Sequence, residues 1–142
     1  MGHCYNTIAL DVPIEEVWAK IKDFHDLSWG EPVITSVDVL GEVSGDQVGA
    51  RRLLNEVFYE TLLSIEPEHF TFSYRIDDGP GPVGKDVINN YIGKVSLRPI
   101  TDTGGTFVEW ISTYETDAEA AVAEFCNPIY AAVLAELKNR FS

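Results

Sequence analysis

Basic residues are scarce in this chain of 142 residues, where ten Lys and Arg stand against 23 Asp and Glu. The net charge of −13 argues against binding to nucleic acid or to an anionic membrane surface, because both partners require a basic face. The carboxylates are spread along the chain, so we interpret them as a solvated surface and not as an acidic tail. We therefore expect no nucleic-acid partner.

Cysteine is also rare, with only Cys4 and Cys126 in the chain. Two cysteines so far apart indicate neither a disulfide framework nor a CxxC metal site. The histidines His3, His25 and His69 lack the spacing of metal ligands, and the GxSxG motif of a serine nucleophile is absent. We expect no metal site and no cofactor, and His25 is either a surface residue or the edge of a pocket.

Long apolar runs are missing, since no uninterrupted run of apolar residues approaches the roughly 18 residues of a membrane span. The first six residues carry no Lys or Arg and lead into no apolar stretch, so they do not resemble a secretory signal. A hydrophobic content of 45% over 142 residues suits one globular domain, residues 1–142. These features predict a cytoplasmic protein without membrane insertion.

The periodicity of the apolar residues predicts a strand, two short helices, six more strands and a long helix. Pro13 suits the first turn of the first helix, and residues 23–30 suit the second. Short turns between the strands require antiparallel pairing, because parallel strands need long crossovers. The expected strands are residues 5–11, 33–40, 48–54, 57–65, 70–76, 87–97 and 106–116.

A segment of about 24 residues at the C-terminal end has the pattern of a long helix with one apolar face. Thr116 and Glu119 are spaced as a capping box, and Pro128 is expected to kink the helix. The apolar face is expected to comprise Ala118, Val122, Phe125, Ile129, Val133, Leu137 and Phe141. This helix is the only element long enough to cover a seven-stranded sheet, and a cavity between the two is a natural consequence.

Several segments together resemble one known superfamily over essentially the whole chain. They are VWAKIKDFHDLSWGEPVITSVDVLG, QVGARRLL, YETLLSIEPEHFTFSYRI, NNYIGKVSLRPI and GGTFVEWISTYET. The sequence is similar to the START/Bet v 1-like (SRPBCC) superfamily, and most of all to its bacterial polyketide cyclase/dehydrase-like and lipid-transport-like branch. The resemblance implies an α+β helix-grip fold, a curved seven-stranded antiparallel sheet wrapped around a long C-terminal helix. Members of the superfamily carry hydrophobic ligands, sense hormones or cyclise polyketides. The resemblance therefore specifies the fold but leaves several activities open.

Arg52 and Glu60 match an Arg and a Glu that recur in this branch. With a simple turn at Asn55–Glu56, Glu60 would oppose Arg51 and form a surface pair worth under about 1 kcal/mol. With a bulge, Glu60 would point inward beside Arg52, which could bind a ligand carboxylate or hydroxyl. Both arrangements are compatible with the sequence.

Rows of aromatic residues alternate along the later strands, where they serve as core or as the lining of a pocket. Tyr hydroxyls and a Trp indole directed at one interior would provide polar points within an apolar volume. The candidate ligand-binding residues are Trp29, Arg52, Glu60, Tyr74, Tyr91, Trp110, Tyr114, Phe125 and Ile129.

The loop at residues 77–86 partly matches a phosphate-binding loop through Gly79, Gly84 and Lys85. Asp86 stands where Ser or Thr would bind magnesium, and a strand follows in place of a helix, so we reject a nucleotide site. The loop is either a lid over a cavity or a plain connection.

We expect this protein to bind a small hydrophobic or amphipathic molecule, such as a lipid, an isoprenoid or a polyketide-like compound, as a monomer or homodimer. The alternative is a cyclase or dehydratase in which Arg52, Tyr74, Tyr91 or Glu60 orients an enol and moves a proton. A protein-interaction role is a third possibility, which would require a large exposed apolar patch.

Overall fold

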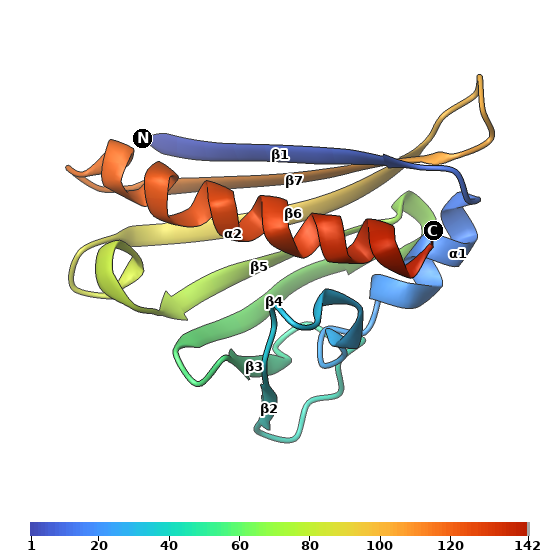
Figure 1. Cartoon of the computed structure of the whole chain (residues 1–142). Coiled ribbons are helices and arrows are strands. Elements are labelled where there is room, and N and C mark those ends of the chain that lie inside the picture. The colour runs from blue at the N-terminus through green and yellow to red at the C-terminus, as the bar shows by residue number, and fades with distance from the viewer. Residues whose placement is uncertain (142) are drawn as a thin grey trace.

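One antiparallel sheet of seven strands carries the long helix α2 (Glu119–Arg140) along one face in the computed structural model, which describes residues 1–141 (Figure 1). The strand order is β1-β7-β6-β5-β4-β3-β2, so only the first strand departs from a simple meander. This is the expected helix-grip fold. The strands are β1 (Gly2–Leu10), β2 (Val37–Leu40), β3 (Arg51–Leu54), β4 (Phe58–Glu66), β5 (Thr71–Asp78), β6 (Asn89–Pro99) and β7 (Thr106–Glu115).

Of the two short helices expected after the first strand, one is an α-helix and the other is a single 3₁₀ turn. Helix α1 (Ile14–Ile21) follows Pro13 and buries its apolar face as predicted. The second segment contains only the turn at Ser28–Gly30. The Asp23 carboxylate accepts the backbone N–H of His25, and the Asp26 carboxylate accepts that of Ser28. Such local side-chain bonds compete with a continuous helix.

The strand before the first hairpin is shorter than the expected 33–40, because its first residues bond elsewhere. The Asn55 side-chain oxygen accepts the backbone N–H of Thr35 at 2.8 Å, and Ile34 donates to the Gly30 carbonyl. Strand β2 therefore begins only at Val37. The other expected strands are confirmed to within three residues at their starts.

Helix α2 continues through Pro128, but the expected capping box at its start is wrong. The Thr116 hydroxyl accepts the Ala118 N–H and donates to the Val87 carbonyl, while the Glu119 carboxylate pairs with the N-terminal ammonium at 2.8 Å. The start of α2 is therefore bonded to Val87, before β6, and to the N-terminus, before β1, and no side chain within residues 1–141 caps this end of the helix.

The buried face of α2 differs from the expected stripe by one residue in its middle turns. Phe125 and Ile129 are only half-buried, and the buried positions are Val122, Cys126, Tyr130, Val133, Leu134 and Leu137. By length and composition alone α2 could cross a membrane. In this fold it is the core helix, lying along the concave face of the sheet (Figure 1).

Candidate ligand-binding cavity

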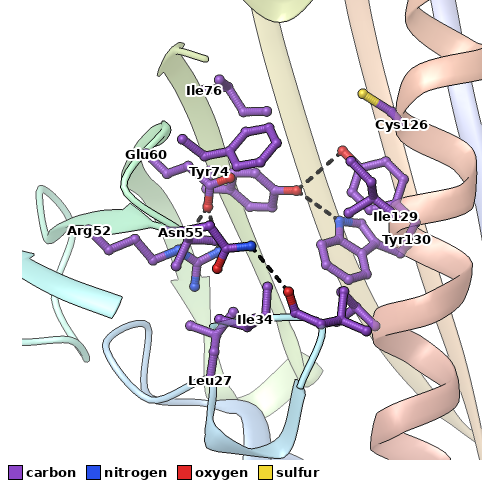
Figure 2. A pocket seen from close by; sticks show the side chains of 15 residues that line it. Leu27, Ile34, Arg52, Asn55, Glu60, Tyr74, Ile76, Cys126, Ile129 and Tyr130 are labelled. Atoms are coloured by element: carbon purple, nitrogen blue, oxygen red, sulfur yellow. Dashed lines mark hydrogen bonds and ion pairs between the residues drawn. The ribbon is translucent and has the colours of Figure 1, made fainter. Parts of the chain in front are cut away.

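A cavity of about 160 Å³ lies between the middle of α2, strands β3 to β5 and the segment at 27–34 (Figure 2). Most of its wall is apolar. Its half-exposed lining residues are Val33, Asn55, Phe58 and Ile129, which therefore mark the mouth. The full lining is Leu27, Val33, Ile34, Arg52, Leu54, Asn55, Phe58, Glu60, Tyr74, Ile76, Trp110, Cys126, Ile129, Tyr130 and Val133.

The turn between β3 and β4 decides that Arg52 and Glu60 both point into this cavity. The turn contains three residues, 55–57, and not the two residues of a simple Asn55–Glu56 hairpin. Since side chains alternate along a strand, one extra residue exchanges the faces of the following strand. Arg52 is consequently paired with Glu60 in the register, and the surface pairing of Glu60 with Arg51 is excluded.

Arg52 and Glu60 form a buried ion pair, with 3% and 5% of their surfaces exposed. Nε and Nη2 of Arg52 both donate to Oε1 of Glu60, at 2.8 and 2.6 Å. Nη1 donates to the Phe24 carbonyl at 3.0 Å, and the guanidinium lies 3.8 Å from the centre of the Phe24 ring. Burial raises the pKa of Glu60 above its ordinary value, and the Arg52 guanidinium limits that rise.

A chain of hydrogen bonds crosses the opposite side of the interior. Trp110 Nε1 donates to the Tyr74 hydroxyl at 3.0 Å, which lies 3.5 Å from the Tyr130 hydroxyl. Tyr130 in turn contacts the Tyr91 hydroxyl, which donates to Ser112 Oγ at 3.0 Å. Because each hydroxyl has one proton, Tyr74 donates to Tyr130 and Tyr130 donates to Tyr91. Burial raises the pKa of Tyr74 and of Tyr130 well above that of an exposed tyrosine.

Gly93 on β6 makes room for the Tyr74 ring. The two residues are paired in the register of β5 and β6. A Cβ atom at position 93 would stand 2.5 Å from the Tyr74 hydroxyl oxygen, inside the van der Waals contact distance. The absence of a side chain at Gly93 therefore sets the position of this hydroxyl in the cavity wall.

Five of the nine residues predicted to bind ligand line the cavity. They come from five different elements, β3, β4, β5, β7 and α2, and the ion pair comes from β3 and β4. Figure 2 labels four of these five residues. These lining residues are Arg52, Glu60, Tyr74, Trp110 and Ile129.

The other four predicted residues lie away from the cavity lining. Tyr91 is behind it, reached through the hydroxyl of Tyr130, and its ring stacks on Tyr114 with 5.3 Å between centres. Phe125 packs against Phe58, a residue of the mouth. Trp29 is buried at a second, smaller pocket that Arg52 also lines, and its indole N–H donates to the Asp26 carbonyl.

The prediction from the sequence missed ten of the 15 lining residues, among them Tyr130, Cys126 and Asn55. The first two would follow from a helical face centred on Val122, Cys126 and Tyr130, which has the same four-residue spacing as the predicted stripe. Burial raises the pKa of the Cys126 thiol to about 11, so it lines the cavity as a neutral group. Asn55 would have been read only as a turn residue.

A carboxylate within the loop at 77–86 holds the two ends of the loop together through hydrogen bonds. Asp78 Oδ1 accepts the backbone N–H groups of Gly79 and Lys85, both at 3.0 Å, and these bonds lower the pKa of Asp78. Val83 anchors the loop in the core.

His25 was predicted to be either a surface residue or the edge of a pocket. It is half-buried, and its Nε2 lies 2.9 Å from the Arg51 carbonyl oxygen. It does not line the cavity.

The chain is similar to several solved structures. A protein from Nitrosospira multiformis is 40% identical, with a TM-score of 0.95 over 99% of this chain and 96% of that one. XoxI from Bacillus cereus is 21% identical, with a TM-score of 0.81 over 99% and 96% of the two chains. Ara h 8.0201 is 18% identical, with a TM-score of 0.69 over 96% and 97%. The last two likenesses show the fold alone.

No protein of curated function matches the chain. The family model described as polyketide cyclase / dehydrase and lipid transport, however, matches residues 1–142. This match spans the strands that form the cavity and the helix that closes it. The chain belongs to the polyketide cyclase/dehydrase and lipid-transport family, within the START/Bet v 1-like superfamily.

Proposed function

We propose that this protein binds a small amphipathic molecule in the cavity between the sheet and α2. The observation that carries the proposal is an apolar cavity of about 160 Å³ with two separate polar groups in its wall, the Arg52–Glu60 pair and the hydroxyls of Tyr74 and Tyr130. An apolar pocket with a few convergent polar groups is the usual form of a small-molecule site.

The cavity volume limits the size of the bound group. An engineered apolar cavity of roughly 150 Å³ takes up one benzene molecule. The cavity between the sheet and α2 has a similar volume, so it accommodates one ring or a short branched chain. A lipid, isoprenoid or polyketide-like ligand would place one such portion inside and extend through the mouth at Val33 and Ile129.

The experiment is a titration of the ¹⁵N-labelled protein with benzyl alcohol, followed by NMR. We expect shifts of the Trp110 indole N–H and of amides around the cavity. Val133→Phe extends a larger side chain into the cavity and should abolish these shifts. Val48→Phe, the same change at an exposed position, should leave them intact. Binding that survives Val133→Phe unchanged in a folded protein would contradict the proposal.

An acid–base enzyme of the cyclase or dehydratase type is the second candidate. It is favoured by a carboxylate, Glu60, at the wall of a cavity large enough for a ring, with a pKa raised by burial. Tyr74 and Tyr130 are unsuited to act as the general base, because burial raises the pKa of both further above neutral. Turnover of an enolisable aromatic ketone, lost in Glu60→Gln, would favour the enzyme over the carrier.

The proposal includes a cytoplasmic protein, monomeric or homodimeric, that takes up its ligand without nucleic-acid or membrane partners. The net charge of −13 supports this part, because it opposes approach to anionic polymers and surfaces. Native mass spectrometry of protein purified from its expression host tests the oligomeric state and any retained molecule in one measurement.

A further inference from the structure

The positive charge of Arg52 and the negative charge of Glu60 balance each other in the cavity wall. Arg52 directs Nε and Nη2 to Glu60 and Nη1 to the Phe24 carbonyl. The Phe24 ring covers one face of the guanidinium at 3.8 Å. Three of the five N–H groups of Arg52 thus bond Glu60 and Phe24, and Glu60 balances its charge, which makes Arg52 a poor receptor for a ligand carboxylate.

On the tyrosine side of the cavity, the polar atoms left for a ligand are hydrogen-bond acceptors. The protons of Tyr74, Tyr130 and Tyr91 are all used in the chain that ends at Ser112. Each of these hydroxyl oxygens still has a lone pair. Both bonds from Arg52 go to Oε1 of Glu60, and no group in residues 1–141 donates a hydrogen bond to Oε2.

A carboxylate ligand would meet unfavourable surroundings in this cavity. It would bring a second negative charge to the wall that holds Glu60, in an apolar interior where like charges repel strongly. It could not donate to the tyrosine oxygens. The net charge of −13 would also slow its approach. A cation would meet the Arg52 guanidinium, so a neutral molecule fits best.

We propose that the cavity selects a neutral, ring-sized hydrogen-bond donor, such as an alcohol, a phenol or a carboxamide, over a carboxylate. Glu60 is the residue that sets this selection, through its negative charge and its free oxygen. The inference rests on the proposed function, since it presupposes binding in this cavity.

The test compares benzamide with benzoate, two planar molecules with equal numbers of non-hydrogen atoms, at neutral pH by NMR titration. We expect the wild-type protein to bind benzamide at least tenfold more tightly than benzoate. Glu60→Gln keeps an acceptor for Arg52 but leaves the guanidinium charge unbalanced, so the preference should fall at least tenfold. Glu66→Gln, an exposed position at the end of the same strand, removes the same charge and should leave the preference unchanged.

Three outcomes would overturn the selection. Equal binding of both probes to the wild type refutes the selection, and so does an unchanged preference in folded Glu60→Gln. In either case, binding of benzyl alcohol would leave the proposed function intact. Failure of both probes and of benzyl alcohol refutes both. If Glu60→Gln does not fold, the double variant Arg52→Gln, Glu60→Gln replaces it, because it contains no unpaired buried charge. Its preference for benzamide should also fall, and an unchanged preference there would contradict the role of Glu60.

Discussion

A buried guanidinium and a buried carboxylate are tolerated when each offsets the desolvation of the other. Arg52 and Glu60 meet this condition at 2.6 Å, with further contacts from the Phe24 carbonyl and ring. Such a pair adds little net stability compared with apolar residues of the same shape, although removal of one partner is costly. The pair is therefore better explained by the chemistry of the cavity than by folding.

We predict that Arg52→Met lowers the free energy of unfolding by about 3–5 kcal/mol, because it leaves the Glu60 carboxylate buried without a charge partner. The double variant Arg52→Met, Glu60→Met should recover most of the loss, within about 1 kcal/mol of wild type. Denaturant unfolding at pH 7 provides the measurement. Similar losses in the single and double variants would show that packing, and not the charge, sets the stability.

The same variant has a defined pH dependence. Without Arg52, the pKa of Glu60 in the folded state rises further above its unfolded value, since burial then acts unopposed. A raised folded pKa leaves stability intact below the unfolded pKa and removes it as the pH rises. The deficit of Arg52→Met relative to wild type should consequently be smaller near pH 4 than at pH 7.

Among the elements, the turn at 55–57 has the largest influence on the site. Asn55 and Glu56 both adopt positive φ, 53° and 62°, which allows the three-residue connection. The Asn55 side chain also accepts the Thr35 N–H at 2.8 Å and donates to the Val33 carbonyl at 3.1 Å. Figure 2 shows this amide beside the cavity. Asn55 thus belongs to the turn that sets the register of β3 and β4, and it also bonds the segment that forms the mouth of the cavity.

We predict opposite effects of glycine at these two neighbouring positions. Asn55→Gly tolerates the positive φ but loses the side-chain hydrogen bonds, which should cost about 1–3 kcal/mol of unfolding free energy. Glu56→Gly removes only an exposed side chain and relieves a left-handed backbone, so stability should stay constant or rise by up to about 1 kcal/mol. Thermal and denaturant unfolding of both variants measure the contrast. Equal effects would refute a structural role for the Asn55 amide.

Across the whole molecule, the hydroxyl chain joins the sheet to the helix. Tyr74, Tyr91 and Trp110 belong to three strands, and Tyr130 connects them to α2. These bonds lie in an apolar interior, where a tyrosinate would be strongly disfavoured. The hydrogen bonds that this chain forms between α2 and the sheet therefore depend on the protonation of the three tyrosines.

This arrangement predicts a loss of stability in alkali. The folded pKa values of Tyr74, Tyr91 and Tyr130 are all raised by burial, whereas an unfolded tyrosine ionises near pH 10. Their stabilising contribution is complete below about pH 10 and falls above it by about 1.4 kcal/mol per pH unit for each tyrosine. Denaturant unfolding between pH 8 and 11 measures the slope. Tyr130→Phe should reduce the slope by about one proton, and ionisation of the buried tyrosines in the folded protein would contradict the prediction.

Local periodicity was sufficient for much of this protein. Alternating and helical patterns predicted seven strands, the first helix and the long last helix, because each pattern needs only one face to be buried. The predictions failed where contacts distant in sequence took over. Because Thr35 donates its backbone N–H to Asn55, β2 begins later than predicted. The Glu119 carboxylate pairs with the N-terminal ammonium and so does not form the predicted capping box.

The helix-grip fold, the family and a set of aromatic and charged residues suited to an interior all follow from the sequence alone. Which of those residues meet in the cavity depends on the register of the strands and the orientation of α2. One additional turn residue put Glu60 beside Arg52, and a rotation of one residue about α2 put Tyr130 and Cys126 at the cavity in place of Phe125. The physical reason is that strand parity and helix orientation change completely with a shift of one residue, while the apolar pattern that predicts the element hardly changes.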